Sequence, residues 1–497
     1  MPLDAAVNSI PDALAASPVA PSVARPASPV DSRALDPRTR LLLEAPIART
    51  LLRLAWPNIV VMLAQASTGL IETWWVSRLG IDALAGIALV FPGFMMMQML
   101  SGGAMGGGIS SAVARALGGG RRDDADALVL HAMVINLALG TMFSVLVLSF
   151  GPSLYRALGG SGGSLTAALL YSNIVFVGTP LVWLMNGLAS VIRGTGNMLV
   201  PSLAVCAGVV VLVPLSPSLI FGIGPFPALG VAGAGLAVVS TTVMVTLVLA
   251  GYIATGRCVV RFRRARLRVK LFGDILRVGA VASVTTLQTT LTVTLTTALV
   301  GTTAGADAIA GYGTGSRLEY LLVPLVFGFG APLVALVGTN IGAGQRERAM
   351  RVALTGGAIA FVLTETIGLV ATTWPAVWLG LFSSEPAMLA AGTQYLRVVG
   401  PVYGFFGLGL SLYFASQGAG RLFWPLIAGL LRMIIAVGGG WLALRVTGWL
   451  NGLFAALGLG LVVYGLVLAA SVAGGAWFRP SRATRLARSA QLTRATR

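Results

Sequence analysis

Charged residues are scarce in this chain, and so are the residue types that most often form disulfides and metal sites. Only 10% of its 497 residues are charged, whereas about a quarter are charged in a typical soluble domain. Two cysteines give no disulfide framework, and a single histidine excludes a histidine-based metal cluster. Hydrophobic residues make up 56% of the chain, and the mean hydropathy is +0.87. The composition therefore indicates a membrane protein.

Motifs for metal-dependent or nucleotide-dependent chemistry are missing as well. The sequence has no His-Glu-x-x-His run, and its glycine-rich segment 102–108 lacks the Lys-Ser/Thr ending of a phosphate-binding loop. Close packing of helices explains that glycine run better. We therefore expect no enzymatic activity, no cofactor and no metal site.

Apolar runs long enough to cross a bilayer recur along the chain. About 20 residues cross the hydrocarbon core as a helix, and the sequence offers twelve such runs, six in each half. We expect helices at 54–77, 83–116, 126–150, 166–192, 198–221, 230–253, 275–300, 308–340, 350–378, 389–416, 425–446 and 453–478. The predicted fold is an all-α membrane protein with twelve transmembrane helices.

The two halves repeat one another in sequence. Residues 80–86 read Gly-Ile-Asp-Ala-Leu-Ala-Gly, and residues 305–311 repeat five of the seven letters at a spacing of 225. Two further echoes follow in the same order at a spacing of 224, where 116–121 matches 340–345 and 193–201 matches 417–425. Glycines and prolines mark turns and helix ends, so the repeat is one of backbone geometry. Since each half holds an even number of helices, we expect two six-helix lobes related by a pseudo-two-fold axis along the membrane normal.

Five domains follow from this division of the chain. The N-terminal segment is rich in Pro, Ala and Ser, and both a linker and the C-terminal segment are basic. The expected domains are a disordered cytoplasmic tail at 1–45, an N-terminal lobe at 46–253, a basic cytoplasmic linker at 254–274, a C-terminal lobe at 275–478 and a basic cytoplasmic tail at 479–497.

Basic residues gather on one side of the predicted helices. When successive connections are assigned to alternate sides, 28 of the 34 Lys and Arg residues lie on the side of both termini. By the positive-inside rule that side is cytoplasmic, as in a multi-pass protein of the bacterial inner membrane. The positive charge is then a topology signal and a contact with anionic lipid rather than a nucleic-acid site. Cys258, in the basic linker, is expected to react with thiol reagents from the cytoplasm.

Several fragments resemble the multidrug and toxic compound extrusion (MATE) family of the multidrug/oligosaccharidyl-lipid/polysaccharide flippase superfamily. They are residues 69–80, 83–86, 193–197, 219–222 and 229–234. The likeness runs in order from about residue 45 to residue 478. The resemblance implies two six-helix lobes around a central, V-shaped cavity, and export of organic, often cationic compounds against an inward flow of H⁺ or Na⁺.

Glu72 is the leading candidate for ion coupling. An ionisable group inside the bilayer is costly and therefore needs a reason, and the predicted spans of its half hold no Lys or Arg away from their ends. Thr68, Gln65 and Asn58 precede it by whole helical turns and share its face. Burial without a cation favours the protonated carboxyl, so a cationic compound and a proton can compete for this one group. The resemblance also places an acidic residue, usually Asp, at this position.

Other polar residues are candidates to line the transport path. In the N-terminal half, interhelical hydrogen bonding is an alternative role for most of them. The resemblance implies an Asn and an Asp on the fifth helix, where this chain has Leu212 and Ser216, and acidic residues on the seventh, where it has Gln288 and Thr289. Loss of those carboxylates favours H⁺ over Na⁺, since a hard cation favours several oxygen ligands. The full set of cavity candidates is Gln65, Thr68, Asn136, Tyr171, Asn173, Asn186, Ser216, Gln288 and Thr289.

The C-terminal half carries five further charged residues away from the ends of its predicted spans. Glu319 and Glu365 can pair with Arg397 or Arg432, while Arg317 points to a different helix face from its neighbour Glu319. Whether these groups are functional or only neutralise one another stays open at this point.

The expected function is a secondary-active efflux transporter. It would act as a monomer and export an organic, cationic compound in exchange for H⁺ or Na⁺, with Glu72 as the coupling carboxylate and membrane lipid around it. The alternative is a lipid-linked saccharide flippase of the same superfamily, which would use cations such as Arg317, Arg397 and Arg432 to handle an anionic head group. The substrate itself is left open.

Overall fold

The computed structural model describes residues 36–382 and 384–478, and within these the side chains of residues 66, 303–308 and 320 are left aside. The described chain is helical and contains no strand. After a short helix α1 (Pro37–Glu44), one arm of the molecule is built from α2 (Ile47–Ser77), α3 (Ile81–Gln98), a π-helix (Met99–Met105), α4 (Gly106–Gly118), α5 (Arg122–Ala157), α6 (Gly162–Val177), α7 (Thr179–Gly194), α8 (Leu199–Phe221) and α9 (Val231–Ala254).

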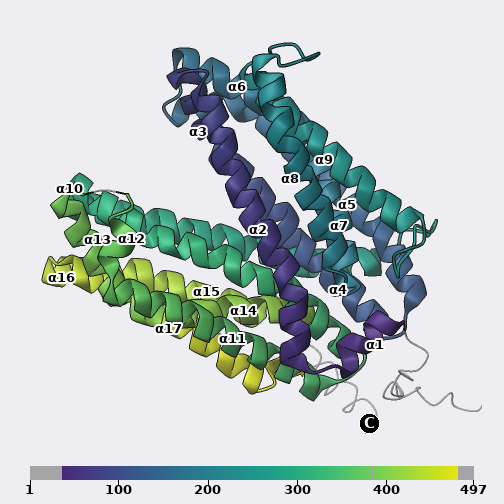
Figure 1. Cartoon of the computed structure of the whole chain (residues 1–497). Helices are drawn as coiled ribbons and strands as arrows, with labels where there is room; N and C mark the ends of the chain where they lie inside the picture. The colour runs from purple at the N-terminus through teal and green to yellow at the C-terminus, as the bar shows by residue number, and fades with distance from the viewer. Residues whose placement is uncertain (1–35, 383, 479–497) are drawn as a thin grey trace, which may run out of the picture.

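The second half of the chain forms the other arm (Figure 1). Its elements are α10 (Val269–Gly342), α11 (Arg346–Thr373), α12 (Pro375–Leu379), α13 (Pro386–Val399), a 3₁₀ turn (Gly400–Val402), α14 (Tyr403–Ala419), α15 (Phe423–Met433), a π-helix (Ile434–Gly439), α16 (Gly440–Thr447), α17 (Leu450–Ala473) and a closing 3₁₀ turn (Ala476–Phe478).

The described helices account for the predicted membrane spans. Eleven are long and apolar enough to cross a bilayer, and α10 supplies two of them, Val269–Thr302 and Ile309–Gly342. A twelfth is the pair α6 and α7, which is bent by 47° where Gly178 separates the two helices. Large apolar side chains such as Leu70, Val210 and Val362 lie 75%, 71% and 63% exposed, as surfaces facing lipid do. The prediction of an all-α membrane protein with two lobes is confirmed.

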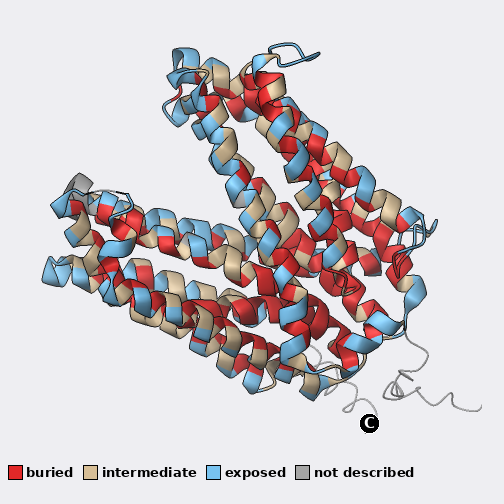
Figure 2. Cartoon of the chain, viewed as in Figure 1, coloured by how far each residue is buried: buried red, intermediate tan, exposed pale blue. Residues whose placement is uncertain are grey.

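The two arms diverge from a shared junction (Figure 1). The junction lies at the end that carries α1 and α4, and buried residues concentrate there (Figure 2). The first half of α2 belongs to it as well, because Leu51 and Ala55 join Leu333 and Val337 of the second arm in one hydrophobic cluster. The arms are therefore packed together at one end and separate at the other.

Helix α1 corrects the expectation of a disordered tail reaching residue 45. Asp36 caps the helix by accepting the N–H of Arg38 at 2.9 Å, and Pro37 occupies its first turn. Leu42 is buried against both arms, because a Cβ at Gly196 would meet its side chain and its carbonyl accepts the Asn340 amide at 3.2 Å. Residues 1–35 and 479–497 lie outside the described residues, and the remaining domain boundaries stay predictions.

Equivalent positions of the repeat occupy equivalent places in the two arms. Helices α5 and α11 begin 224 residues apart, as do α8 and α15. Gly86 packs on the backbone of Ala168 in α6, and Gly311 packs in the same way on Gly392 in α13. Gly196 and Gly420 end their helices at φ 82° and 69°, a left-handed conformation that explains why glycine recurs there.

The pseudo-two-fold axis passes through the junction between α4 and α10. A Cβ at Gly118 would overlap the carbonyl oxygen of Thr339, and a Cβ at Gly342 would overlap that of Arg115. Since Arg115 and Thr339 are themselves 224 residues apart, each half makes the same contact with the other. Such reciprocity is the mark of a two-fold interface, and the predicted parallel arrangement of the halves is confirmed.

The basic linker is tied to the start of α5. Asp126 accepts the backbone N–H of Arg261 at 2.9 Å, and buried His131 accepts that of Arg268 through Nε2 at 2.9 Å. Asp124 pairs with the Arg268 guanidinium at 2.7 Å. The linker is thus held against the first arm, and His131 has a structural role in that contact.

This packing corrects the expectation that Cys258 is accessible. Cys258 is 4% exposed, and its burial raises the pKa of the thiol above the ordinary value. Only the thiolate reacts readily with alkylating reagents, so we expect Cys258 to resist an impermeant maleimide from either side of the membrane. Mass spectrometry of labelled vesicles checks this, and rapid labelling of native Cys258 would contradict the packed linker.

Candidate functional site

Glu72 lies on α2 with its carboxyl turned into the first arm. Its Oε1 atom is buried and has no hydrogen-bond partner in the described part of the chain. The described residues also supply no ion pair to it, whereas the five ion pairs found all involve other carboxylates. Tyr171 of α6 is close enough to interact with it electrostatically. Glu72 therefore holds one carboxyl oxygen away from water and has no compensating cation among the described residues.

The register of α2 against α8 places Ser216 at the depth of Glu72. Ser202 of α8 donates to Asn58 Oδ1 of α2 at 3.3 Å, and further along the same two helices the rings of Trp75 and Phe221 are 6.0 Å apart. Glu72 and Ser216 each follow the bonded pair by 14 residues, which is close to four helical turns. Ser216 is 1% exposed, and its Oγ has no partner among the described residues.

The remaining candidates on α2 and α6 differ in burial. Thr68 is buried but its hydroxyl donates to the Ala64 carbonyl at 2.7 Å, as hydroxyls on spanning helices often do. Gln65 and Asn173 are exposed. The structure thus gathers Glu72, Tyr171 and Ser216 in the first arm and leaves Gln65 and Asn173 on its surface.

Asn136 and Asn186 occupy different environments. Asn136 is fully buried between α5 and α7, where its amide donates to the Ala132 carbonyl at 2.7 Å and lies against Gly187. Asn186 donates to Gln98 Oε1 at 3.1 Å and to Ser101 Oγ at 2.9 Å. It therefore joins α7 to the end of α3 and to the π-helical segment that follows, and the sequence analysis missed both of its partners.

A second polar group lies in the other arm around Glu319. Tyr395 donates to Glu319 Oε1 at 2.5 Å, and Tyr403 donates to the Tyr395 hydroxyl at 3.3 Å. Arg432 Nη2 is 3.9 Å from Glu319 Oε2, so the predicted pairing of Glu319 with an arginine is confirmed. Tyr395 is 224 residues after Tyr171. Both lobes thus set a tyrosine at the same place beside a carboxyl, although the carboxyls come from different helices.

Glu365 corrects the prediction that it pairs with an arginine. Its Oε2 accepts the backbone N–H of Gly404 at 2.6 Å, at the start of α14. A carboxylate at a helix N-terminus is stabilised by the unpaired N–H groups there, so this contact replaces an ion pair. Arg317 lies over the ring of Phe382 at 5.6 Å, and Arg397 is exposed.

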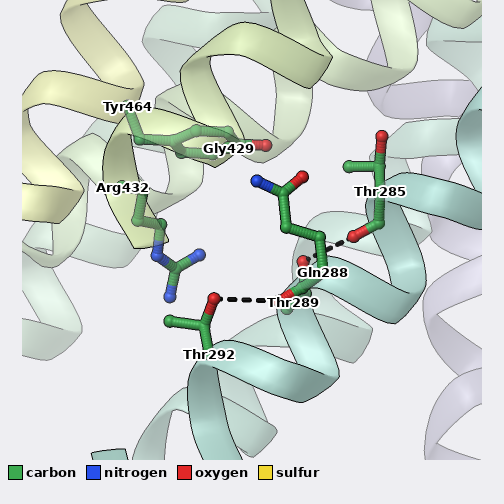
Figure 3. A pocket seen from close by; sticks show the side chains of 7 residues that line it. All are labelled: Thr285, Gln288, Thr289, Thr292, Gly429, Arg432 and Tyr464. Atoms are coloured by element: carbon green, nitrogen blue, oxygen red, sulfur yellow. Dashed lines mark hydrogen bonds between the residues drawn. The ribbon is translucent and has the colours of Figure 1, made fainter. Parts of the chain in front are cut away.

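Gln288 and Thr289 line a small pocket in the second arm (Figure 3). Its volume is about 20 Å³, enough for about one water molecule. Arg432 of α15 and Tyr464 of α17 complete its wall opposite α10. The sequence analysis named Arg432 as an ion-pair partner and as a cation for an anionic head group, but it did not place Arg432 beside Gln288, because the meeting of α15 with α10 depends on the tertiary fold.

Comparison with known proteins places the chain in a family. The sequence model of the MatE family matches residues 57–218 and residues 282–442, one match in each half. A FAD transporter of Shewanella oneidensis is 28% identical over 79% of this chain and 87% of its own length. The multidrug export protein MepA of Staphylococcus haemolyticus is 24% identical over 86% of this chain and 92% of its own length.

The fold has close counterparts among solved structures. A crystal structure of a MATE protein in its bent conformation superposes with a TM-score of 0.82, at 24% sequence identity, over 88% of this chain and 97% of that one. The resemblance inferred from the repeated fragments is therefore confirmed. Since the family model matches well over half of its residues, this chain belongs to the MatE family of membrane transporters.

Proposed function

We propose that this protein is a secondary-active efflux transporter which exports organic compounds in exchange for H⁺, with Glu72 as the coupling carboxylate. The observation that supports it is the buried, unpaired Oε1 of Glu72 on a membrane-spanning helix. A carboxyl desolvated without a cation is neutral when protonated and strongly attracts a cation when ionised. Arrival of a cationic compound therefore favours release of the proton, and this competition at one group exchanges the two ligands.

The surroundings of Glu72 favour H⁺ over Na⁺. The described residues contain no group of three or more His, Cys, Asp or Glu side chains that would hold a metal ion. Neutral oxygens from Tyr171 and Ser216 are the polar neighbours that the fold brings to its depth. A hard monovalent cation would need more oxygen ligands than this group offers.

The orientation of the transporter follows from its basic loops. The linker 255–268 and the turn at 119–121 lie at the junction end of the arms and carry arginines, and the turn at 343–345 leads directly into Arg346 at the start of α11. With this end on the cytoplasmic side of a bacterial inner membrane, the arms diverge toward the outside. Arg264→Cys, exposed in the linker, and Ala228→Cys, exposed in the loop after α8, provide a labelling pair on opposite sides.

Two substrate classes follow from the relatives and from the arginines of the second arm. MepA is named for multidrug export, which supports the organic cations expected from Glu72. The Shewanella relative is named for FAD, a compound with an anionic pyrophosphate, and thus supports an anionic substrate as the second candidate. A lipid-linked saccharide flippase stays the alternative from the same superfamily.

Transport in reconstituted vesicles distinguishes these functions. We expect vesicles with an acidic lumen to accumulate ethidium against its gradient, because protons that leave the lumen drive ethidium in, and to lose this activity when a protonophore collapses the pH gradient. FAD and a fluorescent lipid-linked saccharide are tested in parallel under the same gradient. Movement of the saccharide alone, independent of pH, would reject the efflux function in favour of the flippase.

A further inference from the structure

The pocket in the second arm contains a glutamine with no partner. Gln288 is 8% exposed, and both its Oε1 and Nε2 atoms are buried without a hydrogen-bond partner in the described part of the chain. Buried polar groups are almost always hydrogen-bonded. Figure 3 shows its amide reaching from α10 into the space below Tyr464 and Gly429. An amide left free in this way is placed to bind a molecule that enters the pocket.

Arg432 reaches the same space from α15 (Figure 3). The faces of Phe406 and Tyr464 flank its guanidinium at 5.6 and 5.7 Å, which fixes the group in place. Its ion-pair distance to Glu319 is 3.9 Å, longer than the roughly 2.7–2.9 Å of a charge-assisted hydrogen bond. The guanidinium therefore retains N–H donors for a further acceptor.

The threonines on α10 add hydroxyls that can turn toward such an acceptor. Thr289 and Thr292 donate to the carbonyls of Thr285 and Gln288 at 3.0 and 2.9 Å. A hydroxyl proton rotates to suit its partner. Thr289 is exposed, so the pocket opens to the surface of the arm beside this residue. The end of a ligand can therefore enter the pocket while the rest of the ligand stays outside.

We propose that this pocket binds an anionic group, a carboxylate or a phosphate, at one end of a compound that the transporter exports. The inference rests on the proposed efflux function and gives it a substrate class. Because the pocket has the room of about one water molecule, one oxygen of the anion would enter it and accept hydrogen bonds from Arg432 and from Gln288 Nε2. The other oxygens of the group would stay at the opening beside Thr289. The first arm then carries the acidic group and the second arm the basic one, so the two lobes recognise opposite charges.

Glu319 limits the affinity of this site. It competes with the ligand for Arg432, and it stays in place because Tyr395 donates to its other oxygen at 2.5 Å. Removing its charge with Glu319→Gln should therefore tighten binding of an anion, whereas a purely structural Glu319–Arg432 pair predicts no such gain.

Two flavins that differ only in a phosphate provide the probe. We expect purified protein to bind riboflavin 5′-phosphate about tenfold or more tightly than riboflavin, measured by flavin fluorescence polarisation, with the size set by one charge-assisted pair. Arg432→Gln should remove the preference, Gln288→Leu should reduce it several-fold, and Glu319→Gln should increase it. Arg317→Gln, which removes a more exposed arginine of the same arm, is the matched control and should keep it.

Arg432→Gln leaves Glu319 without its cation and can fail to fold. The double variant Arg432→Gln with Glu319→Gln removes both charges and keeps the test available. A preference for the phosphate that persists in the double variant, or its absence in the native protein, overturns the site. If it is absent while ethidium transport is intact, the subsite fails and the efflux function stands. If the preference for the phosphate is present while no compound is transported, the subsite stands and the efflux function fails.

The source of the anion is tested in the same protein. Inorganic phosphate at millimolar concentration should compete with riboflavin 5′-phosphate, since both present the same group. The affinity of the protein for riboflavin 5′-phosphate should be the same in nanodiscs of phosphatidylglycerol as in nanodiscs of phosphatidylcholine. If the anionic lipid instead abolishes phosphate binding, a lipid head group occupies the pocket, and the assignment to an exported compound is wrong.

Discussion

Glu72→Gln should abolish coupled transport while the protein still folds and inserts. The amide keeps the shape of the carboxyl but cannot release a proton, so binding of substrate can no longer expel one. A neutral amide is also less costly to bury than a carboxylate, and the native carboxyl has no cation that the change would leave unpaired among the described residues. The loss is therefore one of linkage rather than of stability.

Proton release from purified protein in weakly buffered detergent measures this linkage directly. Ethidium should release protons from the native protein, and its affinity should rise with pH by a factor in the range of about 5 to 150 that is typical of coupled sites. In Glu72→Gln both the release and the pH dependence should vanish, and accumulation against a gradient should fall to the level of empty vesicles.

Two other carboxylates serve as controls. Glu365→Gln should release protons as the native protein does, because an amide oxygen can still accept the Gly404 N–H that Glu365 binds at 2.6 Å. Glu319→Gln tests the second arm. If proton release is intact in Glu72→Gln but absent in Glu319→Gln, the coupling role moves to the Glu319 group and the present assignment is wrong.

The repeated glycines show why the fold was largely predictable. Gly86 and Gly311 each sit where a helix packs directly on backbone, and Gly196 and Gly420 each end a helix with positive φ. Such positions tolerate no other residue without strain, so the geometry is written into the sequence at a fixed spacing. The helix α1 was missed because eight residues are too few for a periodic signal, and burial of Leu42 depends on contacts with both arms.

The site was predictable only in part. Glu72 stood out because a charge within an apolar run needs no tertiary information to be noticed. The sequence analysis predicted that Glu319 pairs with an arginine, but it did not predict the hydrogen bond from Tyr395. Both Tyr395 and Arg432 reach Glu319 only because α13 and α15 pack against α10. One signal was available: the repeat spacing relates Tyr395 to Tyr171, and applying it to every polar residue would have matched the two tyrosines.

Gly118→Ala and Gly342→Ala should each destabilise the protein by about 1–3 kcal/mol, the usual penalty for forcing extra atoms into a packed contact. The added Cβ would overlap a backbone carbonyl of the other half, at Thr339 in one case and Arg115 in the other, and backbone cannot rotate away as a side chain can. Because the two contacts are related by the pseudo-two-fold axis, the two losses should be similar. Valine at either position should destabilise further and reduce the amount of protein that inserts.

The midpoint of thermal aggregation in detergent provides the measurement. Gly273→Ala is the matched control, since it lies in α10 like Gly342 but has no atom within 4 Å of its added Cβ. Alanine there should stabilise by about 0.5–1 kcal/mol, the usual gain over glycine inside a helix. The expected effects of the same substitution therefore differ in sign within one helix. If Gly118→Ala and Gly342→Ala also stabilise, the close reciprocal contact between α4 and α10 does not exist, and the arms are joined in another way.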